Sequence, residues 1–420
     1  MPPSTQRIRS IDILRGAVML IMAIDHVRVY SGVPAWSTDY GIFFTRWITN
    51  FCAPAFAFFA GTSAFLYGLR LQNNGAPQST GASSLNSGSS PNIGSSPNSG
   101  SSPKSGSSPN PPSSPNATLS RYLLSRGLLL VILELTLIRF FWTFNLNFGD
   151  FTLAGIIWML GWCMVLMSAL VWLRPLTVGI AGLFILFAQD LFREVPRLLP
   201  AGSRDHFGYF WNFIYPCGHP WSGIAILYVI VPWIGVMMAG YGFGLIMIAE
   251  PARRSRICKW IGSAATIAFL VAGTILVLRD RANDIPIIQQ LLGQRKYPAS
   301  QLFLLMTLGP VIFLIPFAGN WNGKLATVME TVGKVPFFYY LVHILAIHLA
   351  ALVTDYLREG VVNPPWYARA PYVEMEPQHH WPLWLLYLNY FIIVFILYWP
   401  CRWYARYKKA HPENKWLRYV

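Results

Sequence analysis

The stretch Ile13–Tyr30, with the sequence ILRGAVMLIMAIDHVRVY, decides the class of fold. Most of it is an apolar run that is long enough to cross the roughly 30 Å hydrocarbon core of a bilayer as an α-helix. Similar runs recur along the 420-residue chain, which is 54% hydrophobic and only 12% charged. Soluble domains usually carry about 25% charged residues. The sequence therefore predicts an all-α, polytopic integral membrane protein whose helices lie in a lipid bilayer.

Ten apolar segments are predicted to span the membrane. Four basic residues lie close together in the short loop ARRSRICK at residues 252–259, and such basic loops face the cytoplasm. With this loop inside, both termini are predicted to be cytoplasmic, and the N-terminal segment is expected to be a retained anchor. The predicted spans cover residues 11–31, 42–70, 121–143, 151–173, 175–195, 222–248, 257–279, 300–318, 332–355 and 383–404.

Residues 71–120 differ in composition from the rest of the chain. They contain the imperfect repeat GSSPNIGSSPNSGSSPKSGSSPN, which has almost no apolar side chains to bury. Such a segment cannot offset the entropy lost on ordering, so we predict a flexible cytoplasmic linker. The chain is thus divided into residues 1–70 with two spans, the linker, and residues 121–420 with eight spans. The two flanking parts are expected to form one membrane domain.

Charge and cysteine content exclude several classes of protein. The net charge of +15 is explained by basic cytoplasmic loops, so nucleic acid is not an expected partner. The five cysteines are scattered and form no CxxC pair, and therefore predict neither a disulfide framework nor a metal site. An oligomer is compatible with the sequence.

One face of the first predicted helix carries polar residues. Arg15 and His26 are eleven positions apart, which is about three helical turns, so their side chains point the same way about 16 Å from each other. Asp12 lies one turn before Arg15, at a spacing where an ion pair forms. Such a stripe is expected to line a passage or a helix interface rather than to face lipid.

Two interpretations of this stripe are open. A histidine titrates near neutral pH and can act as a general base or as a nucleophile that carries an acyl group, which makes His26 a candidate catalytic residue. The rigid guanidinium fork of Arg15 suits the phosphates of an anionic cofactor. Alternatively, His26 makes a structural contact between helices, and Arg15 is held by Asp12 at the end of the helix.

Asp25 is a second candidate catalytic residue, because it is next to His26 in the sequence. Adjacent residues on a helix point about 100° apart, so Asp25 reaches His26 only if the helix is kinked or ends there. An ion pair with Arg28, three positions later, is the favoured arrangement.

The second predicted span supplies three candidate pocket residues. Arg46 and Asn50 are four positions apart and are expected to share one face of the helix, with Trp47 beside them. They suit substrate binding, and they equally suit anchoring of the helix at the membrane surface.

Three further ionisable residues lie inside predicted spans and are candidate pocket residues. Glu134 is costly in an apolar run unless it is paired, so we expect a basic partner elsewhere in the chain. His343 and His348 point about 140° apart on a helix and are poor ligands for a single metal. His343 is the better candidate to face His26 across a cavity, with a buried structural histidine as the alternative.

Five stretches together resemble bacterial members of the heparan-α-glucosaminide N-acetyltransferase-like membrane family. They are RIRSIDILRGAVMLIMAIDHVR, FFTRWITNFCAPAFAFFAGTSAF, RGLLLVILELTLIRFFWTFN, YPASQLFLLMTLGP and GKVPFFYYLVHILAIH. The Arg15-x10-His26 spacing is also similar to the arginine–histidine motif of the type-three membrane acyltransferases. The eukaryotic lysosomal enzyme has asparagine where His26 stands, and its catalytic histidine lies in the following loop. The corresponding stretch here, VYSGVPAWSTDY, has no histidine.

The resemblance implies a multi-pass acyltransferase of the bacterial inner membrane. Its donor would be cytoplasmic acyl-CoA, with acetyl-CoA as the acyl-CoA that the resemblance implies, and its acceptor a sugar amine or hydroxyl at the outer side. His26 would be the catalytic histidine and Arg15 a residue on the donor side. The rival hypothesis is a carrier or flippase for a small anionic or glycan-linked substrate, because polar residues on spanning helices also mark transport paths.

Overall fold

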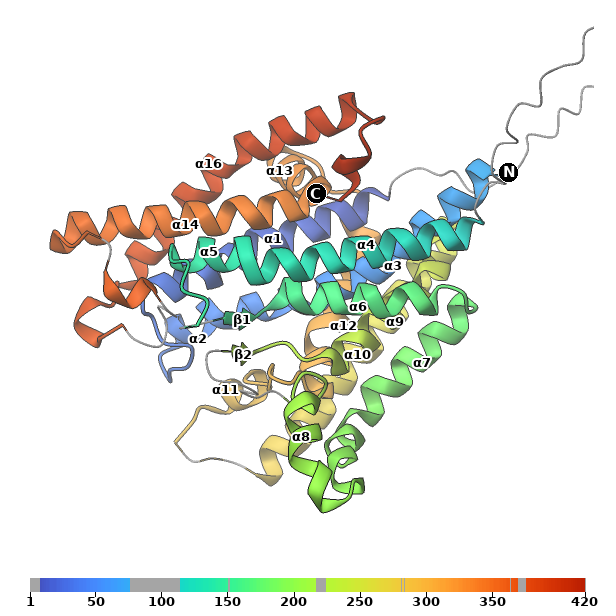
Figure 1. Ribbon diagram of the computed structural model, residues 1–420, viewed down its shortest axis with the longest axis horizontal. Helices are drawn as coiled ribbons and strands as arrows, with labels where there is room; N and C mark the ends of the chain where they lie inside the picture. The colour runs from blue at the N-terminus through green and yellow to red at the C-terminus, as the bar shows by residue number, and fades with distance from the viewer. Residues whose placement is uncertain are drawn as a thin grey trace, which may run out of the picture.

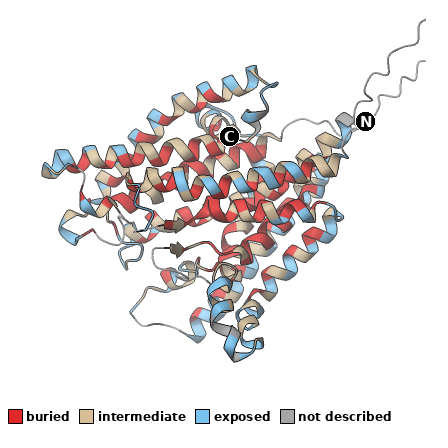
Figure 2. Cartoon of the chain, viewed as in Figure 1, coloured by how far each residue is buried: buried red, intermediate tan, exposed pale blue. Residues whose placement is uncertain are grey.

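The computed structural model describes residues 8–75, 114–149, 152–216, 224–280, 282, 284–362, 364–368 and 375–419. Long helices lie side by side along most of the molecule (Figure 1), and buried residues gather on the faces they turn to one another (Figure 2). The α-helices are α1 (Arg9–Tyr30), α2 (Tyr40–Trp47), α3 (Cys52–Gly75), α4 (Pro115–Leu133), α5 (Arg139–Thr143), α6 (Ile156–Leu170), α7 (Pro175–Ala188), α8 (Ala201–Trp211), α9 (Ile230–Met247), α10 (Pro251–Arg279), α11 (Ile287–Leu292), α12 (Gln301–Ala318), α13 (Lys324–Lys334), α14 (Pro336–Glu359) and α16 (Leu383–Ala410).

Short elements connect these helices. A π-helical turn, Glu134–Ile138, joins α4 to α5, and a 3-10 turn, Ile48–Phe51, joins α2 to α3. Two strands, β1 (Thr152–Ala154) and β2 (Ile224–Ile226), pair in parallel with Leu153 opposite Ala225. The remaining 3-10 turns are Gln189–Arg193, Val195–Leu198, Pro365–Ala368, Pro377–His379 and Lys415–Arg418.

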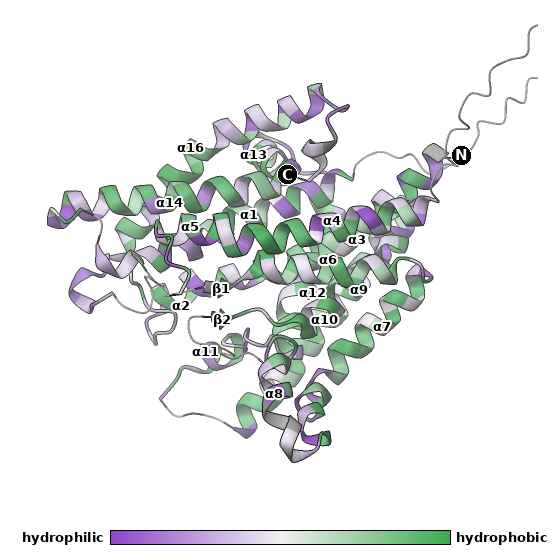
Figure 3. Ribbon diagram, viewed as in Figure 1, coloured by the Kyte–Doolittle hydropathy of each residue, from purple (hydrophilic) through white to green (hydrophobic). Residues whose placement is uncertain are grey.

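The helices have the character expected of membrane spans. Within the described residues, seven helices are long and apolar enough to cross a bilayer. Hydrophilic residues concentrate near the ends of the long helices (Figure 3). Large apolar side chains such as Phe184, Ile275 and Phe395 are more than half exposed, which suits contact with lipid. The all-α class is therefore confirmed, and each predicted span contains a helix.

The starts of two predicted spans are wrong. The spans predicted at 151–173 and 222–248 begin with β1 and β2, and their helices start only at Ile156 and Ile230. A short apolar run does not by itself distinguish a buried strand from a helix, and this ambiguity explains the error.

The predicted linker is also too wide at both ends. α3 continues to Gly75, and α4 begins at Pro115, where the Ser114 hydroxyl accepts a hydrogen bond from the Ala117 amide at 3.2 Å. This is a serine N-cap followed by proline in the first turn, a favourable start for a helix. The central part of the predicted linker, residues 76–113, lies outside the described residues.

The helix α1 has a central position and packs closely on α13, an amphipathic helix absent from the predicted spans. A Cβ added to Gly16 would lie 1.7 Å from the Met329 carbonyl oxygen, and one added to Gly333 would lie 1.8 Å from the Asp12 carbonyl oxygen. Only glycine permits such close approach of two helix backbones. This packing determines how the N-terminal half of α1 is rotated.

The C-terminal end of α1 is held by a buried polar network. The carboxylate of Asp355 accepts hydrogen bonds from the Tyr367 hydroxyl at 2.6 Å and the Trp381 indole at 2.8 Å. The amide of Trp381 donates to the Ser31 carbonyl oxygen at 2.8 Å. These contacts tie the segments around Tyr367 and Trp381 to the helix end that carries His26.

Candidate functional site

Two adjoining cavities lie along one face of α1. The first, of about 280 Å³, is lined by Arg15 and Met19, and the second, of about 200 Å³, by Met22 and His26. Both are also lined by Ile156 of α6 and Tyr340 of α14, so the cavities adjoin at these two residues. The predicted polar stripe thus faces interior space.

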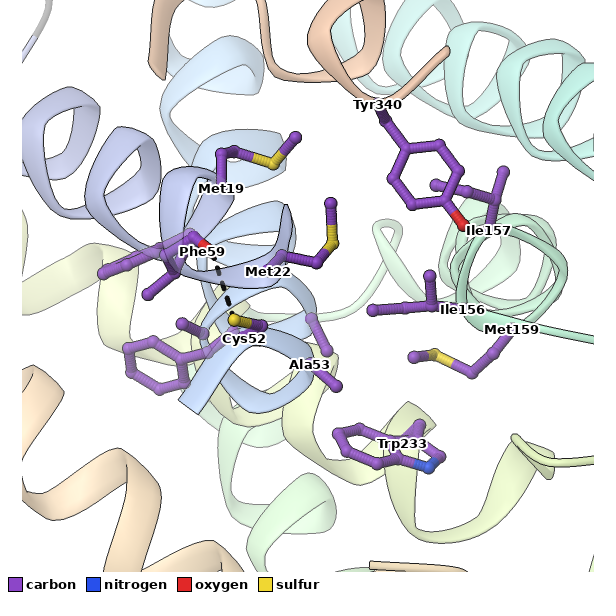
Figure 4. Close-up of a cluster of buried hydrophobic side chains, with 14 of the residues drawn as sticks. Met19, Met22, Cys52, Ala53, Phe59, Ile156, Ile157, Met159, Trp233 and Tyr340 are labelled. Carbon is purple, nitrogen blue, oxygen red and sulfur yellow. Dashed lines mark hydrogen bonds between the residues drawn. The ribbon is translucent and has the colours of Figure 1, made fainter. Parts of the chain in front are cut away.

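Figure 4 shows the buried side chains around this junction. Met19 and Met22 extend from the side of α1 that faces the Tyr340 ring, and the Tyr340 hydroxyl points towards the start of α6. Behind them the Cys52 thiol donates to the Val18 carbonyl oxygen at 3.1 Å, which fastens α3 to α1. The two side chains that line both cavities are thus the apolar Ile156 and the Tyr340 ring with its hydroxyl.

Two guanidinium groups face the first cavity, here called the arginine cavity. Arg15 donates through Nη2 to the Ser63 hydroxyl at 2.6 Å, and its Nη1 lies 3.8 Å from the Asp12 carboxylate. The predicted pair of Asp12 and Arg15 is confirmed. Arg126 of α4 lines the same cavity and donates to the Tyr122 hydroxyl at 2.6 Å. The sequence placed Arg126 at the cytoplasmic end of a span but did not mark it as a site residue.

The second cavity, here called the histidine cavity, is lined by His26, which contacts a second, fully buried histidine, His343. Nδ1 of His26 lies 2.6 Å from Nε2 of His343, and the rings stack with centroids 4.8 Å apart. The other ring nitrogen of His343, Nδ1, lies 2.6 Å from the Tyr340 carbonyl oxygen and 3.0 Å from that of Tyr339. The expected approach of His343 to His26 is confirmed, although its role in any reaction is untested.

These contacts determine the tautomers of both neutral rings. Carbonyl oxygens only accept hydrogen bonds, so Nδ1 of His343 must carry its proton, and its Nε2 is an acceptor. Nδ1 of His26 must then donate to that acceptor. The proton-free nitrogen of His26 is consequently Nε2, which has no hydrogen-bond partner among the described residues. A nitrogen with an available lone pair at a cavity can act as a base or a nucleophile.

Asp25 also lines the histidine cavity, but its contact is with a different residue. Its Oδ1 accepts a hydrogen bond from Nε of Arg28 at 2.9 Å, as predicted. Arg28 also donates to the Val33 carbonyl oxygen at 3.0 Å and is thereby fixed at the end of α1. A catalytic role for Asp25 stays a prediction.

Lys296 is a cavity residue that the sequence analysis missed. It lies between α11 and α12, is 8% exposed, and lines the histidine cavity together with Arg46. Its Nζ lies 5.3 Å from the centroid of the Tyr297 ring. Nothing in its local sequence pattern distinguishes it from an ordinary loop lysine, because only the folding of that loop over the cavity brings it to the site.

The expectation that Arg46 and Asn50 share one continuous helix face is wrong. α2 ends at Trp47, and Asn50 belongs to the following 3-10 turn, which has a tighter winding. Only Arg46 lines the histidine cavity. Trp47 packs edge-to-face against Phe44 and Phe51, and the buried Asn50 lies outside both cavity linings.

The expectation of a basic partner for Glu134 is also wrong. Its carboxylate lies against the start of α6, where Oε1 is beside Gly155 and the backbone amides of Gly155 and Ile157 are its polar neighbours. No ion pair of Glu134 with a basic side chain is present in the part of the chain that the structure describes. The first backbone amides of α6, which have no partner within the helix, take the place of the expected basic side chain. Their partial positive charge favours the Glu134 carboxylate at this position.

His348 lies away from both cavities. Its ring stacks on Phe144 with centroids 3.8 Å apart, and its Nδ1 donates to the Phe141 carbonyl oxygen at 2.8 Å. The prediction that His343 and His348 point in different directions is confirmed. His348 is not among the residues that line either cavity, and the structural interpretation fits its contacts; a pocket role for His348 stays a prediction.

Comparison with known proteins gives one family. Residues 7–278 match the family model described as "Heparan-alpha-glucosaminide N-acetyltransferase, catalytic". The match includes Arg15, His26, Arg46 and Glu134, whereas Lys296 and His343 lie beyond it. No curated protein matches the chain.

Proposed function

Since the chain belongs to the heparan-α-glucosaminide N-acetyltransferase catalytic family, we propose that it transfers an acetyl group from acetyl-CoA to a sugar. The protein is a multi-pass membrane protein with a membrane acetyltransferase domain. In the proposed reaction the donor enters the arginine cavity from the cytoplasm. The acceptor enters the histidine cavity from the opposite side and presents an amine or a hydroxyl. The adjoining cavities on α1 are the observation that carries this proposal.

The arginine cavity has the chemistry that a coenzyme A thioester requires. Arg15 and Arg126 supply two guanidinium groups, which bind phosphate oxygens through paired N–H donors. Much of the rest of the lining is apolar, with side chains such as Leu130, Phe337 and Met164. This lining suits the uncharged arm of the coenzyme, which would place its thioester towards Tyr340.

The histidine cavity supplies the reacting nitrogen. Nε2 of His26 would take a proton from the acceptor, or would itself carry the acetyl group between donor and acceptor. In either case His26 gains positive charge during the reaction. His343 would accept a hydrogen bond from Nδ1–H of His26. This contact would hold the His26 ring and keep Nε2 of His26 free of a proton for the reaction.

The proposal is tested with purified protein in sealed vesicles. Labelled acetyl-CoA is supplied on one side and methyl glucosaminide or methyl glucoside is trapped on the other, and the trapped sugar is analysed for label. Transfer across the membrane is expected only with the protein present. Movement of intact sugar or intact acetyl-CoA across the membrane without acetylation would contradict the proposed acetyltransferase activity and support the carrier hypothesis.

Removal of the two guanidinium groups is expected to weaken donor binding. In Arg15→Gln and Arg126→Gln, the KM for acetyl-CoA should rise about tenfold or more, because a hydrogen bond to a charged group contributes roughly 1.5–3 kcal/mol. The KM for the sugar should not change. Arg256→Gln, at an exposed position of α10, is the matched control. An unchanged donor KM in the variant that lacks both guanidinium groups would place the phosphates elsewhere.

A further inference from the structure

Glu134 is buried, faces the histidine cavity, and has one carboxylate oxygen in use and one unused. Glu134 is only 2% exposed. The backbone amides of Gly155 and Ile157 are the polar neighbours of the carboxylate, whereas Oε2 is buried and has no hydrogen-bond partner among the residues that the structure describes. A buried acceptor without a donor is costly, so folded proteins rarely keep one without a reason.

The local backbone is built around this carboxylate. Glu134 begins the π-helical turn, and single turns of this kind inside α-helices occur frequently at functional sites. A Cβ on Gly155 would lie 2.2 Å from Oε1 of Glu134, so only glycine leaves room for the carboxylate at the start of α6. The π-helical turn and the start of α6 thus enclose Oε1, while Oε2 has no hydrogen-bond partner among the described residues.

We propose that Oε2 of Glu134 binds the amine of the acceptor sugar beside His26. This inference rests on the proposed acetyl transfer. The charged groups that line the same cavity are Asp25, Arg28, Arg46 and Lys296, of which Asp25 and Arg28 pair with each other. Among the described cavity-lining acids, Glu134 is the one without a basic side-chain partner, so it is the site for an incoming ammonium group.

The proton balance of N-acetylation gives Glu134 a second proposed role, as a base. A sugar ammonium group, R–NH₃⁺, passes one proton to Nε2 of His26, and the resulting amine attacks the thioester carbon. The C–N bond forms, the C–S bond breaks, and the thiolate takes the proton back from His26. The new N-acetyl group still carries one proton too many, and Glu134 takes it and releases it to water. A hydroxyl acceptor loses only one proton, so a second base favours N-acetylation.

The test compares Glu134→Gln with the unaltered protein in two measurements. Gln keeps the size of the side chain and an oxygen for the α6 amides, but turns an N–H donor towards the cavity. In the transfer assay, kcat/KM for methyl glucosaminide should fall about 100-fold, mainly through KM, while the KM for acetyl-CoA stays the same. Glu194→Gln, an exposed member of an ion pair with Arg197, is the control.

Sugar binding without acetyl-CoA separates this inference from the proposed function. The unaltered protein should bind methyl glucosaminide about tenfold more tightly than methyl glucoside, and Glu134→Gln should lose that preference. Preference without acetyl transfer would support the role of Glu134 and overturn the proposed function. Transfer with unchanged amine kinetics in the variant would overturn the role of Glu134. If Glu134→Gln does not fold, the unaltered protein still provides a test. Equal binding of both sugars by the unaltered protein would overturn the proposed role of Glu134.

Discussion

Replacement of His26 by alanine is expected to lower kcat/KM for acetyl transfer about 10³-fold. General acid–base catalysis by a positioned side chain typically contributes 10²–10⁴-fold, and covalent catalysis through the same nitrogen would also be lost. His26 lines the histidine cavity, and His343 engages only its Nδ1, which leaves Nε2 without a proton. The measurement is the initial rate of acetyl transfer from labelled acetyl-CoA to methyl glucosaminide.

The matched control for this variant is His411→Ala. His411 is partly exposed just after α16 and contacts only Tyr407 among the contacts described for its ring. Its replacement should leave the rate within about twofold. Donor binding should survive in His26→Ala, since the arginine cavity is unchanged. A His26→Ala protein that transfers acetyl groups at the unaltered rate would remove the imidazole from the mechanism.

Replacement of His343 by phenylalanine is expected to lower kcat about 10²-fold with little change in either KM. Phenylalanine keeps an aromatic ring at this position but cannot accept the hydrogen bond from Nδ1–H of His26. His26 then loses the contact that selects its tautomer, and its imidazolium form loses a hydrogen bond. In serine proteases the residue that orients the catalytic histidine has this kind of effect on kcat. The measurement is steady-state kinetics for both substrates.

Rescue distinguishes positioning from a general loss of packing. In His343→Gln the amide oxygen is able to accept the hydrogen bond from Nδ1 of His26, so kcat should recover about tenfold over His343→Phe. Thermal unfolding of both variants shows whether stability follows the same order. Equal rates in the two variants, or rates that track only stability, would contradict a positioning role for His343.

Local helix geometry accounts for the part of the site that was predictable. Residues three apart on a helix lie next to each other whatever surrounds the helix. The pairs Asp12–Arg15 and Asp25–Arg28 could therefore be predicted from spacing alone, as could the common direction of Arg15 and His26. The failed prediction for Arg46 and Asn50 follows the same logic, because it assumed an α-helix where the chain forms a tighter turn.

Contacts between distant segments could not be predicted in this way. His26 and His343 are 317 positions apart, and their contact depends on how α1 and α14 are rotated against each other. That rotation depends on packing at positions such as Gly16, where backbones approach too closely for any side chain. The same holds for Lys296, which an irregular loop carries into the histidine cavity, and for Glu134, whose donors belong to another helix.

The sequence alone determined that this chain forms apolar helices for a membrane and that Arg15 and His26 share one face of the first. Spacing within one helix is a local property, so these features needed no knowledge of the neighbours. Tertiary structure alone decided that the face lines two adjoining cavities, that His343 selects the tautomer of His26, and that Glu134 keeps an unused oxygen there. These features depend on close packing between helices far apart in the chain, which only the complete set of side-chain contacts specifies.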